Sequence, residues 1–335
     1  MFHLEEIKKV LQAEQKFRLR QALKAIYQQG IESWDELSVF SKDLREKLKK
    51  DISLEIKAKS YETSDKKTIK VVFDFGKNIE AVLMCHQGRN TVCVSTQIGC
   101  SMACDFCYSG KFGLERNLSE DEIILQVLYF NRLLKKENSR VSNVVFMGMG
   151  EPFANYNNVL GAIKILNDKE LFNIGARHIS VSTSGLVPGI KKLAKEKLQI
   201  NLSVSLHASS DEVRDKIMPI NKTYNIDTLL EATRNYIKQT RRRVMIEYVM
   251  LAGINDSPKD ANELTKLLKE KLGDLFFVNI IKYNSTGEYE SSPKNKIEVF
   301  KRILIDEGID VVERYRFGKD IKAACGQLAK EENKK

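Results

Sequence analysis

Apolar segments of two kinds alternate along most of the chain. From residue 92 onward, six short apolar runs are each followed by a stretch whose apolar positions recur with helical spacing. Repeated strand–helix units predict a parallel sheet with right-handed crossovers. Because six units are too few to close an eight-stranded barrel, we predict a partial (β/α)6 barrel, with a doubly wound sheet as the alternative. The predicted strands are NTVCVST, NVVFMG, HISVSTSG, INLSVSLHA, VMIEYVMLAG and FFVNIIKYN.

Helices are predicted between these strands. The first begins with Ser119-x-x-Glu122, a capping box that satisfies backbone donors at a helix start. Several predicted strands also end in polar or glycine-rich phrases, and β/α barrels build their sites from such strand ends. The predicted helices span residues 119–136, 158–167, 190–197, 227–238, 258–271 and 294–307.

The first 90 residues have a different pattern. Residues 1–60 predict short helices, beginning with a run whose apolar positions repeat at helical spacing and which stops at Gly30. TIKVVFDF and NIEAVLM, joined by GKN, predict a β-hairpin. We therefore divide the chain into a helical N-terminal accessory domain at 1–60, a hairpin connecting segment at 61–90, and a core at 91–335 that ends in a C-terminal tail.

The charge balance suggests a polyanionic partner. The 335 residues include 55 Lys and Arg against 45 Asp and Glu, a formal net charge of +10, and a basic excess of this kind is common in nucleic-acid-binding proteins. Basic runs lie at 42–50, 64–70 and 238–244. Solvated helix faces and loops are the simpler interpretation of each, but this explains Arg241–Arg243 least well, because a folded protein gains little from three adjacent like charges at the start of a strand. Without a signal-peptide core or a membrane-length apolar run, we expect a cytoplasmic protein that binds no membrane.

Four of the six cysteines lie between Cys93 and Cys107. In a reducing compartment, crowded cysteines indicate metal binding or reactivity rather than structural disulfides. Cys100, Cys104 and Cys107 form C-x3-C-x2-C. Zinc would require a fourth ligand, whereas a [4Fe-4S] cluster held by three cysteines keeps one iron open for a substrate or cofactor. The spacing favours the cluster over zinc.

The cysteine motif, with Phe106 before its last cysteine, is the signature of the radical S-adenosylmethionine superfamily, whose core is a partial (β/α)6 barrel. Further phrases narrow the resemblance to the RlmN/Cfr family of RNA adenine methyltransferases, from about Phe17 to Ala329. These phrases are GMGEP, STSG, SLHA, MPINK, IEYVMLAGIND and DIKAACGQLA.

The resemblance implies cofactors and their sites. One [4Fe-4S] cluster per chain, bound by Cys100, Cys104 and Cys107, would reduce S-adenosylmethionine to a 5′-deoxyadenosyl radical, and two S-adenosylmethionine molecules would be used per turnover. The positions that match the family's S-adenosylmethionine contacts are Gly150, Glu151, Ser182, Ser205, Leu206, His207 and Asn284.

The resemblance also assigns three catalytic residues. Cys325 would carry the methyl group as S-methylcysteine, and its methylene radical would add to the base to give a covalent RNA adduct. Cys93 would resolve the adduct through a transient disulfide with Cys325. Glu80 would accept the proton from the methylated carbon. Cys85 matches no functional position.

Pro152, which follows the Glu of GMGE, is typical of the branch that methylates adenine C2. The implied substrates are an adenosine in the peptidyl-transferase centre of 23S rRNA and the adenosine 3′ to the anticodon of tRNA. A flavodoxin-like protein would supply electrons, and a monomer is expected. The alternatives are C8 methylation, as in the antibiotic-resistance branch, and a non-catalytic, metal-stabilised RNA-binding protein.

Overall fold

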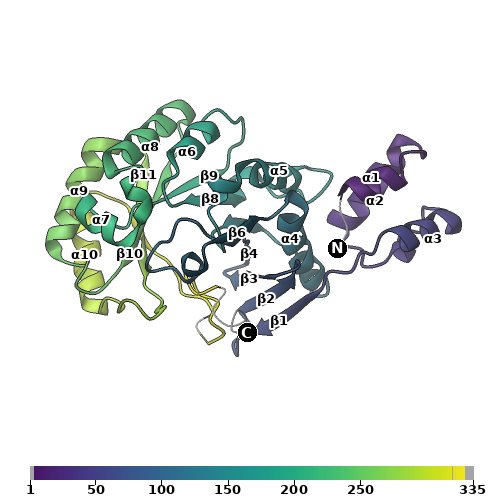
Figure 1. Ribbon diagram of the computed structural model, residues 1–335, viewed down its shortest axis with the longest axis horizontal. Coiled ribbons are helices and arrows are strands. Elements are labelled where there is room, and N and C mark those ends of the chain that lie inside the picture. Colours follow the sequence, from purple (N-terminus) through teal and green to yellow (C-terminus); the bar gives the residue numbers. More distant parts are fainter. Residues whose placement is uncertain (1–3, 319, 329–335) are drawn as a thin grey trace.

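The computed structural model describes residues 4–318 and 320–328. Residues 1–3, 319 and 329–335 lie outside the described residues. The start of the predicted N-terminal domain, 1–60, and the end of the predicted core, 91–335, fall among them. Within the described part, ten strands form one curved sheet, and helices cover its outer face (Figure 1). The strands follow one another in the sheet in the order β1-β2-β3-β4-β7-β8-β9-β10-β11-β12.

The parallel part of the sheet forms the predicted partial barrel. Each strand from β4 to β12 pairs in parallel with the next strand in this order, so the doubly wound alternative, which needs a reversal of strand order, is wrong. The six predicted strands are present, and the short β12 adds a seventh. The strands are β4 (Arg89–Cys93), β7 (Asn143–Phe146), β8 (Ile179–Thr183), β9 (Asn201–Ser205), β10 (Val244–Met250), β11 (Phe276–Lys282) and β12 (Val311–Glu313).

All six predicted helices of the core are present, with ends shifted by a few residues. The capping box is formed: Ser119 Oγ accepts from the Glu122 amide at 3.2 Å, and Glu122 Oε2 accepts from the Ser119 amide at 2.8 Å. The apolar sides of these helices are buried against the sheet. The helices are α4 (Glu120–Lys135), α5 (Tyr156–Asn167), α6 (Val187–Leu193), α8 (Ile226–Thr240), α9 (Pro258–Leu272) and α10 (Lys294–Asp306), with α7 (Asp211–Ile217) as a short addition.

The predicted hairpin is formed by β2 (Thr68–Asp74) and β3 (Asn78–His86). It is not separate from the barrel, because β3 also pairs antiparallel with β4, and this register places Val82 opposite Cys93. A further strand, β1 (Ala58–Glu62), pairs antiparallel with β2. The hairpin therefore extends the barrel sheet and forms one wall beside its first strand.

The N-terminal region is helical, as predicted, with α1 (Leu4–Val10), α2 (Lys16–Tyr27), a 3₁₀ turn at Trp34–Glu36 and α3 (Lys42–Asp51). It projects from one end of the molecule (Figure 1). Arg132 of α4 fastens it to the core by donating to the carbonyl oxygens of Ile31 and Leu54, the latter at 2.9 Å.

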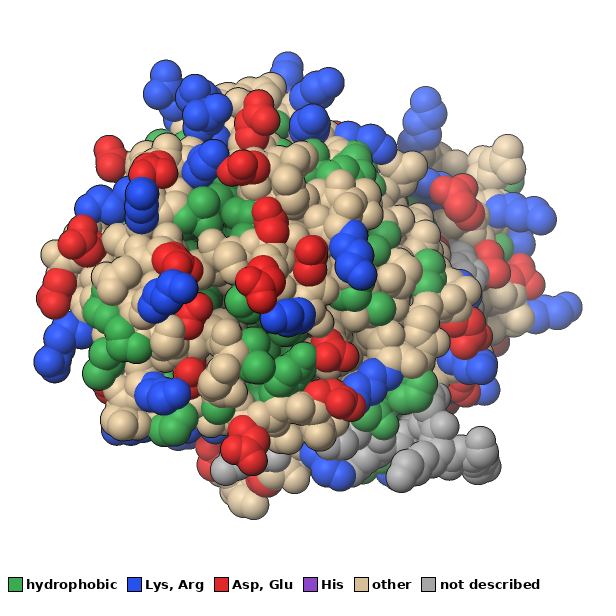
Figure 2. Space-filling model, turned by 60° about the vertical axis from the view of Figure 1, so that its left-hand side comes forward, with side chains coloured by type: hydrophobic (Ala, Val, Ile, Leu, Met, Phe, Trp, Pro, Cys, Tyr) green, Lys and Arg blue, Asp and Glu red, His purple; other side chains and the backbone are tan. Residues whose placement is uncertain are grey.

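Charges of both signs cover the face shown in Figure 2, where several Lys and Arg side chains gather along the upper rim and others are interspersed with acidic side chains over the rest of the face. On this face the excess positive charge does not form one continuous basic surface. None of the described helices combines the length and apolar character needed to cross a lipid bilayer.

Candidate active site

The C-x3-C-x2-C motif lies in the loop between β4 and α4. Two short antiparallel strands, β5 (Gln97–Gly99) and β6 (Leu114–Asn117), close the base of this loop. The Cys100 amide donates to the Gly113 carbonyl oxygen at 2.8 Å. Gly99 has φ +74°, and a Cβ there would overlap the Gly113 carbonyl oxygen. Glycine is therefore required immediately before the first cysteine.

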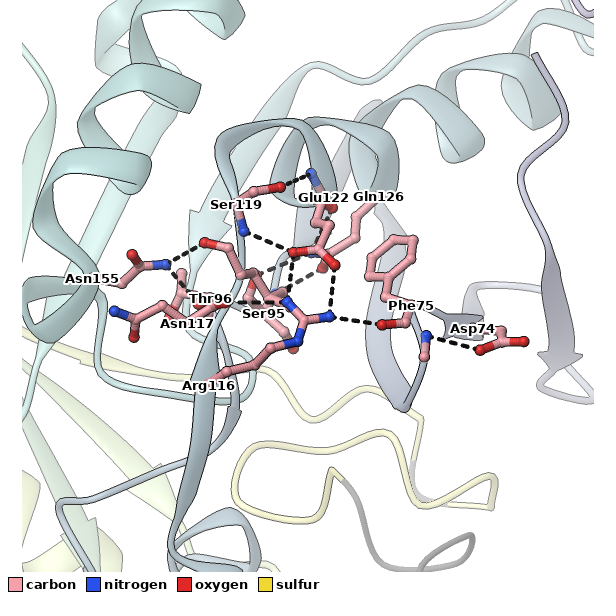
Figure 3. Close-up of polar contacts among 12 residues, drawn as sticks. Asp74, Phe75, Ser95, Thr96, Arg116, Asn117, Ser119, Glu122, Gln126 and Asn155 are labelled. Carbon is pink, nitrogen blue, oxygen red and sulfur yellow. Dashed lines mark hydrogen bonds and ion pairs between the residues drawn. The ribbon is translucent and has the colours of Figure 1, made fainter. Parts of the chain in front are cut away.

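Polar side chains behind the loop fix its two ends (Figure 3). Arg116 makes a two-pronged ion pair with Glu122, with both distances 2.8 Å, and donates to the Phe75 carbonyl oxygen at 2.7 Å. Gln126 exchanges two hydrogen bonds with the Ser95 backbone, at 2.8 and 3.0 Å. Because these groups are largely buried and paired, they hold the loop in one position.

Cys100, Cys104 and Cys107 line one pocket at the carboxyl ends of the barrel strands. Burial raises the pKa of Cys100 to about 12 and also raises the pKa values of Cys104 and Cys107. Thiols in such an environment stay protonated unless a metal centre compensates the thiolate charge.

The geometry of these thiols fits a cluster. Within residues 4–318 and 320–328, no three His, Cys, Asp or Glu side chains are arranged to hold one metal ion. In a [4Fe-4S] cluster each cysteine binds a different iron, so the thiols need to face one pocket without converging on a point. Cys100, Cys104 and Cys107 satisfy this condition.

Six of the seven predicted S-adenosylmethionine contacts line the same pocket; Leu206 does not. Glu151, after β7, is buried, which raises the pKa of its carboxyl group. Its carboxylate accepts from the Phe153 amide at 3.0 Å and from the amide and hydroxyl of Ser184 at 2.7 and 2.8 Å. Gly150 has φ +98°, and a Cβ there would lie 2.6 Å from the Gln97 side chain. The backbone after β7 can therefore pack this closely against Gln97 only with glycine at position 150.

His207 is buried as an uncharged ring, and Leu206 offers a backbone carbonyl oxygen. Burial lowers the pKa of His207 to about 4, and its Nδ1 accepts from the Val249 amide at 3.1 Å. The uncharged ring packs edge-on against Phe106, with centroids 5.0 Å apart. Leu206 is fully buried, and its carbonyl oxygen accepts from the buried Arg214 at 3.0 Å. Arg214 was not predicted from the sequence.

Glu247 is a second residue that the sequence prediction missed. Ser182 and Ser205 donate to its carboxylate at 2.7 and 3.3 Å, and Arg314 forms an ion pair with it. Burial would raise the pKa of Glu247, but the Arg314 charge and these hydrogen bonds outweigh it, and the net shift is downward. Arg314 also donates to the Cys325 Sγ at 3.4 Å. The only signal in the sequence was one charged residue within an otherwise apolar predicted strand, VMIEYVM.

Cys325 lies in a tail segment that is docked on the cluster loop. The Tyr108 amide, next to Cys107, donates to the Gly326 carbonyl oxygen at 2.9 Å. Asn284 Nδ2 donates to the Cys325 carbonyl oxygen at 3.2 Å. The tail therefore brings the sixth cysteine to the cysteine pocket, although more than 200 residues separate it from Cys107.

A second pocket adjoins the first, and Cys325 lines both. The second pocket also contains Cys93, at the end of β4, whose burial raises the pKa of its thiol to about 12. Cys93 and Cys325 are both free thiols in this structure. Cys85 is a half-buried free thiol on β3 and lines neither pocket.

Glu80 is buried on β3, and its carboxylate lies 3.5 Å from the Lys70 Nζ. Its side chain is on the same face of β3 as Val82, which lines the second pocket, because alternate residues of a strand share a face. Glu80 is not among the residues that line either pocket. The structure therefore places it near the second pocket but behind its wall.

Two of the three arginines at Arg241–Arg243 have structural partners. Arg242 donates to Asn201 Oδ1 at 3.1 Å, and Arg243 pairs with Asp310 and bonds the Phe276 carbonyl oxygen at 3.0 Å. These contacts account for both side chains without a phosphate group.

Comparisons with known proteins agree with this arrangement. Residues 94–265 match the model of the radical SAM superfamily, and residues 4–54 match the ribosomal RNA large subunit methyltransferase N-terminal domain. A probable dual-specificity RNA methyltransferase RlmN from Dictyoglomus turgidum is 45% identical over 98% of this chain and 95% of its own. One of the same description from Bacillus velezensis is 44% identical over 99% of this chain and 92% of its own.

Among solved structures, a radical SAM methyltransferase from Sphaerobacter thermophilus superposes with a TM-score of 0.91 at 40% identity, covering 97% of each chain. The chain therefore belongs to the RlmN family of radical S-adenosylmethionine RNA methyltransferases.

Proposed function

We propose that this enzyme methylates C2 of an adenosine in the peptidyl-transferase centre of 23S rRNA, and of the adenosine 3′ to the anticodon in tRNA. The observation that carries the proposal is the position of Cys325. It lines both the pocket of the three cluster cysteines and the pocket of Cys93. A group transferred to its sulfur can therefore face the cofactor pocket on one side and a substrate on the other.

The cofactor pocket fits a [4Fe-4S] cluster on Cys100, Cys104 and Cys107, with S-adenosylmethionine held by the residues at the strand ends. When bound, these groups supply both a transferable methyl group and hydrogen-abstracting radical chemistry. Glu151 offers a buried carboxylate to the methionine ammonium group, and Ser182 and Asn284 offer hydrogen-bonding groups to its polar atoms. Their fixed positions would orient the cofactor.

Cys325 would accept the methyl group as a thioether and later carry the covalent link to the base. Arg314, bonded to the Cys325 sulfur, and Asn284, bonded to its backbone, hold it at the boundary of the two pockets. Cys93 would release the product by forming a disulfide with Cys325, which a cytoplasmic reductant then reopens. Glu80 is the proposed proton acceptor; to act, its carboxylate must exchange the Lys70 contact for one with the second pocket.

Three further expectations belong to this proposal. The enzyme acts in the cytoplasm as a monomer, and a flavodoxin-like protein provides the electrons. Pro152 begins a 3₁₀ turn directly after Glu151 and lines the cofactor pocket. It is the residue that associates this chain with C2 rather than C8 methylation.

The deciding experiment combines product analysis with adduct trapping. Purified enzyme that contains iron is incubated with S-adenosylmethionine, reductant and RNA, and the digested RNA is compared by mass spectrometry with 2-methyladenosine and 8-methyladenosine standards. The first product is expected; the second would reassign the enzyme to C8 methylation, and neither product would favour a non-catalytic RNA-binding protein.

Adduct trapping tests the two catalytic cysteines. Cys93→Ala should accumulate a covalent enzyme–RNA species, and the double variant Cys93→Ala/Cys325→Ala should not. Cys85→Ala is the matched control, because its thiol lies on the neighbouring strand outside both pockets. An adduct in the double variant would refute the role of Cys325.

A further inference from the structure

Three aromatic side chains form a cluster at the edge of the second pocket. His86 and Tyr315 stack, with ring centroids 4.7 Å apart and an angle of 22° between the planes. Phe317 lies 4.7 Å from Tyr315 and 5.8 Å from His86. His86 ends β3, whereas the other two residues follow β12 at the opposite edge of the parallel strands. We call these three residues the aromatic cluster; all of them line the second pocket.

Tyr315 keeps one ring face open. The three centroid distances form an acute triangle, so His86 and Phe317 approach Tyr315 from the same side and cannot cover opposite faces of its ring. The residue is 55% exposed, among the highest values for large apolar residues in the described part of the chain. An exposed aromatic face supported from behind by two other rings is a rigid surface on which a planar group can stack.

The surrounding charge points to a polyanion. The residues that line the second pocket include Arg89, Lys282, Arg314 and Arg316, and none is acidic. Arg314 is neutralised by Glu247, but no described acidic residue forms an ion pair with the other three. Arg316 instead bonds the neutral Asn284 at 2.7 and 3.0 Å. Unpaired cations beside an open aromatic face are the combination with which proteins bind single-stranded nucleic acid.

We propose that Tyr315 is the stacking platform for the RNA base next to the target adenosine, with Arg89 and Arg316 facing the flanking phosphates. The inference rests on the proposed function and specifies how its RNA is held. The second pocket, of about 360 Å³, falls within the size range of ligand sites, so a flipped-out base can enter between Cys93 and Cys325 while its neighbour stacks outside.

This arrangement suits an enzyme with two RNA substrates. Every base has a π face, so stacking holds a nucleotide with little regard to its identity. One platform can therefore serve an rRNA loop and a tRNA loop whose sequences differ. Tyr315 is a positioning residue in this account, because it touches the neighbouring base and not the reacting carbon.

The test uses RNA lacking single bases. The probe is a stem–loop from the peptidyl-transferase centre of 23S rRNA, with an abasic site placed either 5′ or 3′ to the target adenosine. Binding to full-length, iron-containing enzyme is measured by fluorescence anisotropy. One abasic position should weaken binding to the wild-type enzyme by about tenfold, the equivalent of one lost stacking contact. Equal affinities for intact RNA and both abasic RNAs would overturn the proposal without any variant.

Protein variants supply the second arm. Tyr315→Ala should weaken binding of intact RNA by about tenfold, raise KM more than it lowers kcat, and abolish the penalty for the abasic site. Tyr315→Phe should restore wild-type binding because it keeps the ring. Val299→Ala is the control, since Val299 is 49% exposed on α10 and does not line the pocket. Iron content and melting temperature verify that each variant is folded.

The outcomes separate the two proposals. A Tyr315→Ala enzyme that still distinguishes abasic from intact RNA overturns the platform, whatever product the wild-type enzyme makes. If the wild-type enzyme binds abasic RNA more weakly than intact RNA but makes no methylated adenosine, the proposed function is overturned and the platform stands.

Discussion

Gly99 should be indispensable to the cluster loop, and a matched pair of substitutions can show why. Gly99 and Gly253 have nearly the same backbone angle, φ +74° and +72°. A Cβ at Gly253 would meet nothing within 4 Å, whereas one at Gly99 would overlap the Gly113 carbonyl oxygen. Gly253→Ala therefore introduces only the conformational cost of a left-handed alanine, about 1 kcal/mol.

Gly99→Ala carries the same conformational cost and two further ones. The strands β5 and β6 must separate, which breaks the 2.8 Å hydrogen bond between Cys100 and Gly113 at about 1 kcal/mol. Displacing the backbone against the paired groups behind it adds about another 1 kcal/mol. The total is about 3 kcal/mol, roughly 2 more than for Gly253→Ala. For a chain of this length, that excess corresponds to a drop of about 3 °C in melting temperature.

The assay measures iron per chain after anaerobic reconstitution together with thermal unfolding. Because Cys100 directly follows Gly99, we expect Gly99→Ala to hold less iron than Gly253→Ala and to melt at a lower temperature. Should both variants bind iron equally and melt together, the close contact between β5 and β6 would not be what positions the first cysteine.

Two further predictions concern buried side chains, Cys93 and Glu247, whose pKa values are shifted in opposite directions. Because burial raises the pKa of Cys93 to about 12, its thiol should resist iodoacetamide at pH 8 while the exposed Cys325 is alkylated; equal labelling by peptide mass spectrometry would contradict this. Glu247 has a lowered pKa, so its ion pair with Arg314, which is 22% exposed, stabilises the protein at neutral pH, and this contribution is lost as the pH falls through the lowered pKa. Glu247→Gln should therefore cost about 2 kcal/mol at pH 7, and this cost should decrease steadily as the pH is lowered into the acid range. A pH-independent difference in denaturant midpoints would show that the pair is not the cause.

Hydrophobic periodicity was sufficient for the barrel and the hairpin. Its limit lies in short or partly exposed strands: β12 has three residues, and β1 has the polar sequence AKSYE. Such segments become strands because an adjacent edge supplies hydrogen-bond partners, which no local pattern reveals. The joining of β3 to β4 was missed for the same reason, since the hairpin alone does not show which sheet it extends.

At the site, the cysteines could be found because three thiols so closely spaced in a reduced protein are typical of a metal-binding loop. Glu247 and Arg214 could not be assigned in the same way. Glu247 is one charged residue in an otherwise apolar strand, whereas Arg214 is one of several charged residues in α7 (DEVRDKI). The partners of both come from other elements: Arg314 for Glu247, and the carbonyl oxygens of Ser184 and Ser205 for Arg214. Their importance depends on burial, and burial is a property of the folded chain.

The fastening of the N-terminal helices by Arg132 has a consequence for experiments that shorten the chain. Arg132 is 8% exposed, and its guanidinium group donates to the Ile31 and Leu54 carbonyl oxygens. Deleting residues 1–56 would remove both acceptors, expose the guanidinium group to water and open the apolar residues packed around it to solvent. A truncated enzyme that loses RNA methylation would then be reporting a damaged barrel as well as a missing domain, and the melting temperature and iron content of the truncated enzyme would separate the two effects.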